Sequence, residues 1–101
     1  MKVETILIKL KKDIKAKTYD YVPTGKNKES RRKYGLTMFE IEDLLLKLKK
    51  EDLVKGPIKD YDYLDEEVFI FKKEIMRGII FYIKIKEKNN QIKILSCHED
   101  E

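Results

Sequence analysis

The chain has 101 residues, of which 42% are hydrophobic and 42% are charged, and its net charge is +4. This length fits a single domain spanning 1–101, and the composition is too apolar for a disordered chain and too charged for a membrane protein. Because no apolar run approaches roughly 20 residues and no signal peptide begins the chain, we expect a cytoplasmic protein with no membrane contact.

Helical patterns dominate the amino-terminal half. Residues 2–17 predict an amphipathic helix whose apolar stripe consists of Val3, Ile6, Leu7, Leu10 and Ile14. A short strand over 19–22 is followed by a polar helix over 25–35, which we expect to be exposed. Thr37 and Glu40 form a capping box for a third helix. Its buried stripe consists of Met38, Ile41, Leu44, Leu45 and Leu48.

The carboxy-terminal half changes to the period of strands. Gly56-Pro57 ends helical structure, and a loop or short extended segment follows over 61–65. Residues 68–71 are apolar on both faces, as in a strand buried on both sides. Residues 79–86 alternate, with one face formed by Ile79, Phe81, Ile83 and Ile85 and the other by Ile80, Tyr82, Lys84 and Lys86.

Turn residues connect these strands into a sheet. Arg77-Gly78 predicts one turn, and Asn89-Asn90 predicts a hairpin leading into a last strand over 92–98. We expect the tail 99–101 to be solvated. The predicted fold class is α+β, with the amino-terminal helices packed on one side of a small antiparallel sheet.

Motifs of the common catalytic and metal sites are missing from the sequence. It has no Gly-rich phosphate loop, no G-x-S-x-G elbow, no H-E-x-x-H and none of the usual carboxylate spacings for a metal, so we expect no metal and no cofactor. The single Cys97 excludes an internal disulfide, and one Cys beside one His cannot form a nucleophile, base and orienting triad.

Polar side chains on the expected sheet are the remaining candidates for chemistry. Tyr82 and Lys84 line one strand face, and His98 ends the neighbouring strand. Cleaving RNA without a metal requires a base for the 2′-hydroxyl, an acid for the leaving 5′-oxygen and cations around the phosphorus. His, Tyr and Lys supply these groups, although each can also be an ordinary half-buried or solvated sheet residue.

Charge is distributed unevenly along the chain. Residues 1–50 carry 14 Lys and Arg against seven Asp and Glu, a balance of +7, whereas residues 51–101 carry nine against 12, a balance of −3. A basic half indicates an anionic partner, either nucleic acid or an acidic protein. Lysine also keeps small proteins soluble, so the asymmetry alone does not choose a partner.

Short motifs spread over nearly the whole chain resemble the MqsR (motility quorum-sensing regulator) family of bacterial toxins. They are the segments Tyr34-Gly35-Leu36-Thr37, Glu51-Asp52-Leu53-Val54-Lys55-Gly56-Pro57, Glu67-Val68-Phe69-Ile70-Phe71, Phe81-Tyr82-Ile83-Lys84-Ile85 and Ile94-Leu95-Ser96-Cys97-His98-Glu99. The resemblance implies a RelE-like fold. It also implies the toxin of a type II toxin–antitoxin pair, a metal-independent endoribonuclease that cleaves messenger RNA, inhibits translation and arrests growth.

The resemblance also assigns roles to individual residues. Tyr82 matches the tyrosine of a tyrosine-x-lysine strand, His98 matches a terminal histidine or lysine, and Lys55 matches a lysine after the helix, so these three are expected to be catalytic. Apart from these matches, the cationic and aromatic side chains on or beside the sheet are expected to bind RNA phosphates or bases: Lys84, Arg77, Lys72 and Tyr61. The implied partners are messenger RNA, a cognate antitoxin protein and the ribosome.

Two features count against this assignment. The family places a polar residue on its first long strand, where 68–71 is wholly apolar, so that role is empty or moves to Lys72. A regular two-residue turn also pairs Tyr82 with Cys97, which points Tyr82 and His98 to opposite faces unless a bulge intervenes near Ser96. The alternative function is a small basic protein that binds nucleic acid or protein, such as a phage-encoded inhibitor, and cleaves nothing.

Overall fold

A computed structural model of residues 1–101 contains three α-helices, a single 3₁₀ turn and one five-stranded sheet. The elements in chain order are α1 (Val3–Ala16), β1 (Asp20–Tyr21), α2 (Gly25–Tyr34), α3 (Met38–Leu46), η1 (Lys50–Asp52), β2 (Leu53–Lys59), β3 (Glu67–Met76), β4 (Ile79–Lys88) and β5 (Gln91–Glu99). The strands lie in the order β1-β5-β4-β3-β2, with β1 parallel to β5 and all other neighbours antiparallel. The predicted α+β class is confirmed, and the strands predicted over 19–22, 68–71, 79–86 and 92–98 correspond to β1, β3, β4 and β5. The sheet is mixed instead of antiparallel, because β1 runs parallel to β5, and β2 is the one additional strand.

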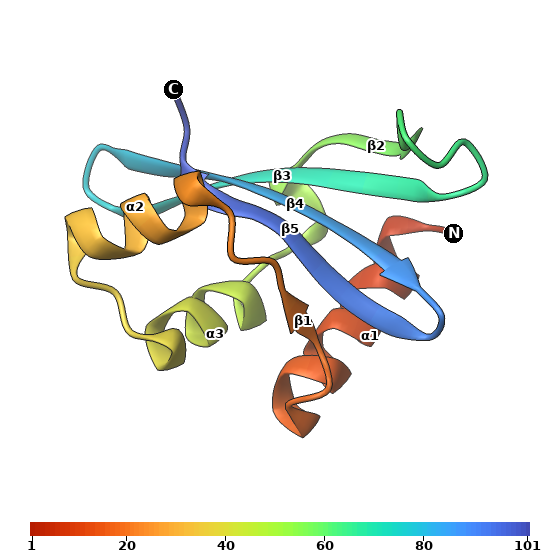
Figure 1. Cartoon of the computed structure of the whole chain (residues 1–101), viewed down its shortest axis with the longest axis horizontal. Helices are drawn as coiled ribbons and strands as arrows, with labels where there is room; N and C mark the ends of the chain where they lie inside the picture. Colours follow the sequence, from red (N-terminus) through yellow and green to blue (C-terminus); the bar gives the residue numbers. More distant parts are fainter.

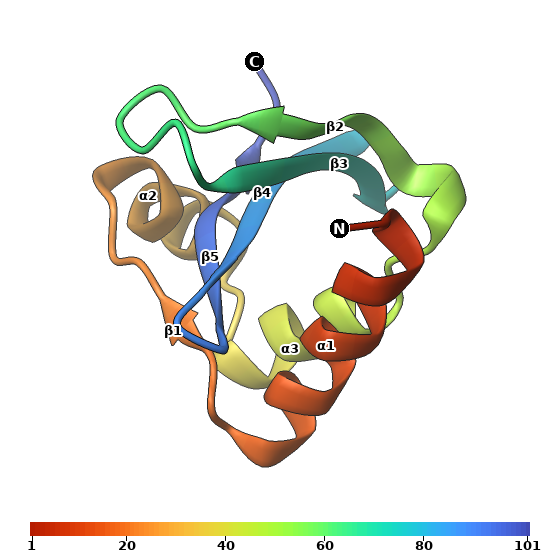
Figure 2. The same ribbon diagram turned by 90° about the vertical axis from the view of Figure 1, so that its right-hand side faces the viewer.

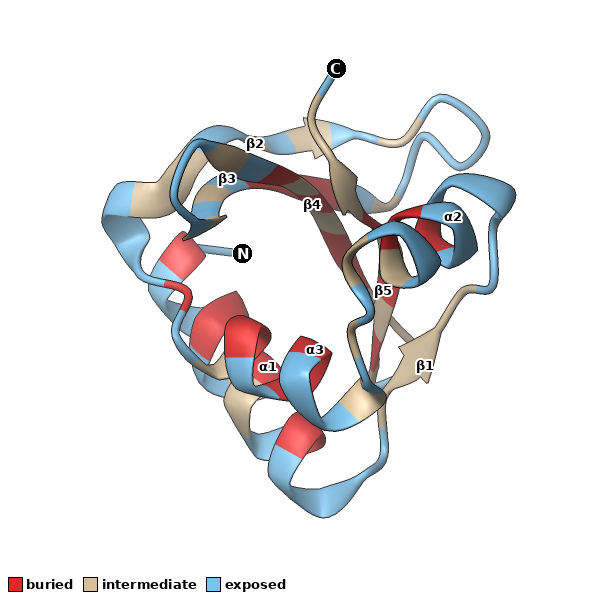
Figure 3. Ribbon diagram, turned by 90° about the vertical axis from the view of Figure 1, so that its left-hand side faces the viewer, coloured by how far each residue is buried: buried red, intermediate tan, exposed pale blue.

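Helices α1 and α3 lie together on one face of the sheet (Figures 1 and 2). The apolar stripe predicted for residues 2–17 is buried, and each fully buried Ile or Leu contributes about 2 kcal/mol to folding. Figure 3 shows buried segments on both helices and on the strands that they face. The residues that the sheet turns towards these helices form its inner face: Phe69, Phe71, Phe81, Ile83, Ile85, Ile92, Ile94 and Cys97.

Capping residues begin and end the helices where the sequence predicts. The Glu40 backbone N–H donates to Thr37 Oγ1 at 3.1 Å and the Thr37 N–H donates to Glu40 Oε1 at 3.0 Å, which completes the capping box of α3. Thr24 caps α2 in the same way, and Gly35 ends it in the left-handed conformation. None of the helices is long and apolar enough to cross a membrane.

Helix α2 has no apolar face and lies beside β5, at the edge of the sheet (Figure 2). Its only buried residues are polar: Asn27 and Ser30. Their side chains form hydrogen bonds with the β5 backbone. The prediction that α2 is exposed therefore holds for its outer side, while polar contacts attach its inner side to the sheet.

Strand β2 is absent from the sequence-based prediction, which ended regular structure at Gly56-Pro57. The pattern failed because β2 is an edge strand with two register shifts against β3, so its residues do not alternate regularly between the two faces. Gly56 adopts a φ of +133°, and a Cβ there would lie 2.9 Å from both the Cα of Phe69 and the carbonyl oxygen of Val68. Only glycine lets β2 approach β3 this closely.

Replacing Gly56 with alanine is therefore expected to destabilise the protein by roughly 2 kcal/mol or more, because the new methyl group meets backbone atoms that cannot rotate away. Urea unfolding monitored by circular dichroism measures the change. The matched control is Gly25→Ala, where a Cβ meets nothing within 4 Å and stability should change by no more than about 1 kcal/mol. Equal stability of the two variants would contradict the close approach of β2 to β3.

Candidate functional site

A bulge in β5 brings Tyr82 and His98 onto the same face of the sheet. The β4–β5 hairpin turns at Asn89 and Asn90, both with positive φ, and pairs Lys88 with Gln91 as predicted. The register then shifts, because Ile85 pairs with Ile94 whereas Lys84 pairs with Ser96, which leaves Leu95 as an extra residue. Beyond this bulge Tyr82 lies directly opposite His98. The predicted pairing of Tyr82 with Cys97 is wrong, and the condition set for convergence, a bulge near Ser96, is met.

The two side chains form a stacked aromatic pair. Their ring centres are 5.5 Å apart and their planes differ by 22°. His98 Nδ1 lies 3.0 Å from the carbonyl oxygen of Glu99. Because a carbonyl can only accept, this hydrogen bond requires the proton on Nδ1, and it leaves the Nε2 lone pair of a neutral ring free for another proton.

Lysines and polar residues surround this pair on the outer face, the face turned away from α1 and α3. Lys72 of β3 pairs with Tyr82, and Lys84 of β4 pairs with Ser96. A pocket of about 400 Å³ opens here, lined by Lys26, Tyr82, Lys84, Ser96, His98, Asp100 and Glu101. The site thus combines a base, a phenol and cations in one open hollow.

The acidic residues at 99–101 contact this site, which corrects the expectation of a solvated tail. Lys33 Nζ lies 2.8 Å from Glu99 Oε1, Lys72 Nζ lies 3.1 Å from Asp100 Oδ2, and Lys26 Nζ lies 3.7 Å from Glu101 Oε1. The hydrogen bond from Lys33 lowers the pKa of Glu99. Sequence reasoning missed Lys26, Ser96, Asp100 and Glu101 as pocket residues, because only the bulge and the position of α2 bring them together.

The other predicted site residues lie outside this pocket. Lys55 is exposed on β2 and pairs with Ile70, which pairs with Lys84, so two strand spacings put its backbone roughly 10 Å from that of Lys84. Arg77 is exposed in the β3–β4 turn, and Tyr61 is 96% exposed in the loop between β2 and β3. The structure therefore gathers Tyr82, His98, Lys84 and Lys72, and leaves these three residues apart.

The outer face of the sheet carries two apolar residues of β3 beside its lysines. Val68 and Ile70 are buried there and pair with Lys86 and Lys84. Lys72, two residues further along β3, is the polar neighbour opposite Tyr82. The predicted alternative polar position on β3, Lys72, therefore lies beside the aromatic pair.

Lys86 lies on the predicted polar face of its strand, where a lysine is ordinarily solvated, but only 5% of it is exposed. Its amine lies 2.8 Å from Asp60 Oδ2 and 2.8 Å from Glu66 Oε1, and it also lies over the ring of Tyr63. Hydrogen bonding to Lys86 lowers the pKa of both carboxyl groups. Burial acts to lower the pKa of Lys86, but its two carboxylate contacts outweigh that effect and raise it. These residues form a buried ion-pair cluster that holds the β2–β3 loop on the sheet.

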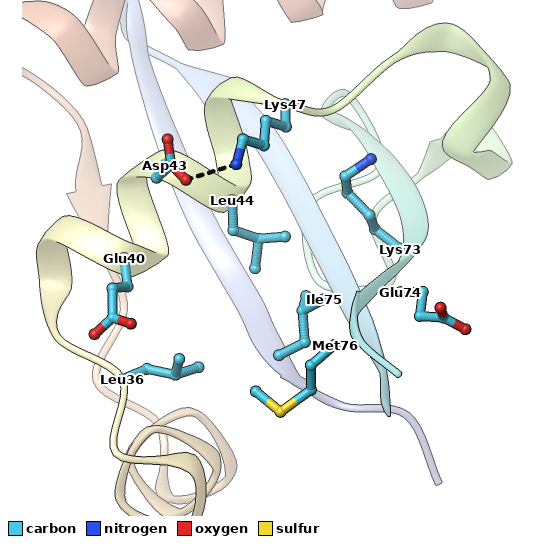
Figure 4. Close-up of a pocket in the computed structure, with 9 residues that line it drawn as sticks. All are labelled: Leu36, Glu40, Asp43, Leu44, Lys47, Lys73, Glu74, Ile75 and Met76. Atoms are coloured by element: carbon cyan, nitrogen blue, oxygen red, sulfur yellow. Dashed lines mark ion pairs between the residues drawn. The ribbon is translucent and has the colours of Figure 1, made fainter. Parts of the chain in front are cut away.

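Two further features of the structure lie outside the candidate site: the buried Cys97 thiol and a second pocket. Burial raises the pKa of the Cys97 thiol to about 12, so this residue stays protonated and is a poor nucleophile. A second pocket of about 350 Å³ lies between α3 and the end of β3, with Leu36, Leu44, Ile75 and Met76 as its apolar residues and the Asp43–Lys47 ion pair at its rim (Figure 4). Its other polar residues are Glu40, Lys73 and Glu74, and none of the residues predicted for the functional site lines it.

No cluster of three or more His, Cys, Asp or Glu side chains has an arrangement that could hold a metal ion. Comparisons of this chain with models of protein families, with curated proteins and with solved structures gave no match.

Proposed function

We propose that this protein is a metal-independent endoribonuclease that cleaves messenger RNA, the toxin of a type II toxin–antitoxin pair with a RelE-like fold. The observation that carries the proposal is the register of Tyr82 opposite His98, which stacks an imidazole on a phenol beside Lys84 and Lys72 in an open pocket. The resemblance of the sequence motifs to the MqsR family supports the same function.

In the proposed reaction, His98 Nε2 removes the proton from a 2′-hydroxyl and the 2′-oxygen attacks the adjacent phosphorus. The bond from phosphorus to the 5′-oxygen breaks, and the Tyr82 hydroxyl donates its proton to that oxygen. The products are a 2′,3′-cyclic phosphate and a 5′-hydroxyl. Lys84, which has no ion-pair partner, stabilises the charge that grows on the phosphate oxygens.

The substrate is single-stranded RNA, because the bases of an unpaired strand are exposed and can stack on aromatic side chains such as the exposed Tyr61. Lys55 lies on the same cross-strand row as Lys84, roughly two strand spacings away. We assign it to a neighbouring phosphate instead of the one that is cleaved. The basic amino-terminal half is the surface that an acidic antitoxin would cover.

The test is cleavage of an end-labelled messenger RNA by the purified protein in EDTA. We expect fragments that end in a 2′,3′-cyclic phosphate, and we expect none from the Tyr82→Phe/His98→Ala double variant. Lys28→Ala, an exposed substitution on α2, serves as the matched control and should cleave like the unaltered protein. If the RNA stays intact, the assay is repeated on translating ribosomes. Intact RNA there too would exclude the proposed endoribonuclease activity.

A non-catalytic binding protein is the second candidate, and one observation favours it. Carboxylates at 99–101 pair with three lysines around the pocket, so part of the positive charge is already neutralised. RNA binding that is retained in the double variant, without cleavage by either protein, is the result expected for this function.

A further inference from the structure

The bulge at Leu95 sets the alignment of the candidate site, so the residues that hold the bulge matter. Strand β1 pairs with the outer edge of β5 only at Lys93 and Ile94, and the Val22 N–H then donates to the Ile94 carbonyl oxygen at 3.0 Å. Beyond that point no strand covers this edge. The backbone groups of the bulge therefore need partners from elsewhere, because unpaired backbone groups in a protein interior are costly.

Asn27 of α2 supplies these partners. Its side chain is fully buried, its Nδ2 donates to the carbonyl oxygen of Leu95 at 3.3 Å, and its Oδ1 accepts from the N–H of Cys97 at 2.8 Å. One side-chain amide thus bonds two β5 residues that are two positions apart, which is the pattern in which a residue of a parallel strand bonds its neighbour. It continues the β1–β5 ladder across the bulge.

A third hydrogen bond of the Asn27 side chain and one that Ser30 accepts also attach α2 to β5 and to the segment before α2. Asn27 Nδ2 also donates to the Val22 carbonyl oxygen at 2.9 Å, which ties the amide to the segment after β1. Ser30, one turn along α2, accepts from the N–H of Glu99 at 2.9 Å. The hydrogen bonds at Cys97 and Glu99 lie on either side of His98, so α2 holds the backbone on both sides of the imidazole.

We propose that Asn27 is a positioning residue, whose buried amide holds the Leu95 bulge and thereby keeps His98 opposite Tyr82. Without the bulge, the hairpin would continue in the regular register set by its turn, with Tyr82 opposite Cys97 and His98 on the other face. The consequence for cleavage rests on the proposed function, but the effect on the alignment of the two rings does not.

His98 is the only histidine in the chain, so its ring protons give an unambiguous nuclear magnetic resonance signal. In the unaltered protein the stacked ring of Tyr82 should shift these protons upfield, and Tyr82→Leu gives the value without stacking. We expect Asn27→Ala to move the His98 signals to that unstacked value while the amide signals of α1 and β3 stay in place. The matched control Lys28→Ala, on the exposed side of α2, should leave the His98 signals unchanged.

Deleting Leu95 provides the rescue. With that residue removed, the regular register of the hairpin itself pairs Tyr82 with His98, so the bulge and its amide partner are no longer needed. We expect Asn27→Ala combined with this deletion to fold and to recover the upfield His98 signals. This combination of Asn27→Ala with the deletion keeps the proposal testable even where Asn27→Ala alone does not fold.

Two results would overturn the inference. If the His98 ring protons of Asn27→Ala stay shifted upfield, the two rings are still stacked, and burial of Cys97 on the inner face is enough to keep the bulge. If the variant that combines Asn27→Ala with the deletion of Leu95 lacks the upfield shift, or does not fold, then Asn27 supports the fold without setting the register. If the proposed function is right, kcat for RNA cleavage should fall in Asn27→Ala and recover with the deletion. If the His98 signals respond as expected and no variant cleaves RNA, only the proposed function fails.

Discussion

Replacing His98 with glutamine is expected to slow RNA cleavage by roughly 10²–10⁴-fold, the contribution of a well-placed general base. Glutamine can still donate to the Glu99 carbonyl oxygen in place of Nδ1, but it cannot take a proton from a 2′-hydroxyl. Single-turnover cleavage of a labelled RNA measures the loss. RNA affinity, measured separately by filter binding, should change little because the neighbouring lysines remain.

The pH dependence of the rate separates a base from a residue that only binds. An imidazole base must be neutral to accept a proton, so the cleavage rate of the unaltered protein should rise with pH. His98→Gln should lose this rise. Tyr82→Phe should keep it while lowering the rate by roughly 10²-fold, because it removes the proposed acid and leaves the stacked ring in place. A rise that persists in His98→Gln would exclude His98 as the base.

The sequence predicts most of the elements of this site because their patterns are local. The alternation over 79–86 puts Tyr82 and Lys84 on one strand face, and Asn89-Asn90 predicts the turn that starts the hairpin. The register beyond the bulge is not local. It depends on a hydrogen bond between Leu95 and Asn27, which are 68 positions apart in the chain, and the polar pattern of 25–35 gives no sign that one of its side chains is fully buried.

Strand β2 and the buried Lys86 differ most from the sequence-based predictions, and both depend on contacts between segments that are not adjacent in the chain. Strand β2 has no alternating pattern because its irregular pairing with β3 breaks the period of two. Lys86 has the sequence context of a solvated lysine, and its burial depends on where the β2–β3 loop places Asp60 and Glu66. Asp and Glu in a loop give no periodic signal, so the sequence does not predict where they lie.

Replacing Lys86 with methionine is expected to have the largest effect on stability, a loss of roughly 3 kcal/mol, because it leaves buried carboxylates without their counter-charge. Urea unfolding at pH 7 measures it. Lys84→Met is the matched control, since Lys84 lies on the same face of β4, is half-buried and has no ion-pair partner. Its stability should change by less than about 1 kcal/mol. Equal losses in the two variants would show that the buried ion-pair cluster contributes no more to stability than a half-buried lysine without an ion-pair partner.

The pH dependence of stability gives an independent check on the cluster, because its groups shift in opposite directions. The pKa values of Asp60 and Glu66 are lowered by folding, so their stabilisation is present above the unfolded values near about 4 and is lost as pH falls through the folded values. The pKa of Lys86 is raised, so its stabilisation is present below the unfolded value near about 10 and is lost as pH rises through the folded value. The stability difference between the unaltered protein and Lys86→Met should therefore be largest between about pH 5 and 10 and should shrink on both sides.

A charge-neutral cluster distinguishes lost pairing from lost packing. Adding Asp60→Asn and Glu66→Gln to Lys86→Met removes the unpaired carboxylates and should recover part of the stability, because the remaining side chains carry no buried charge. If the triple variant is less stable than Lys86→Met alone, the loss comes from packing around the loop. In that case the exposed Tyr61 and the rest of the β2–β3 loop are held by contacts other than the ion pairs.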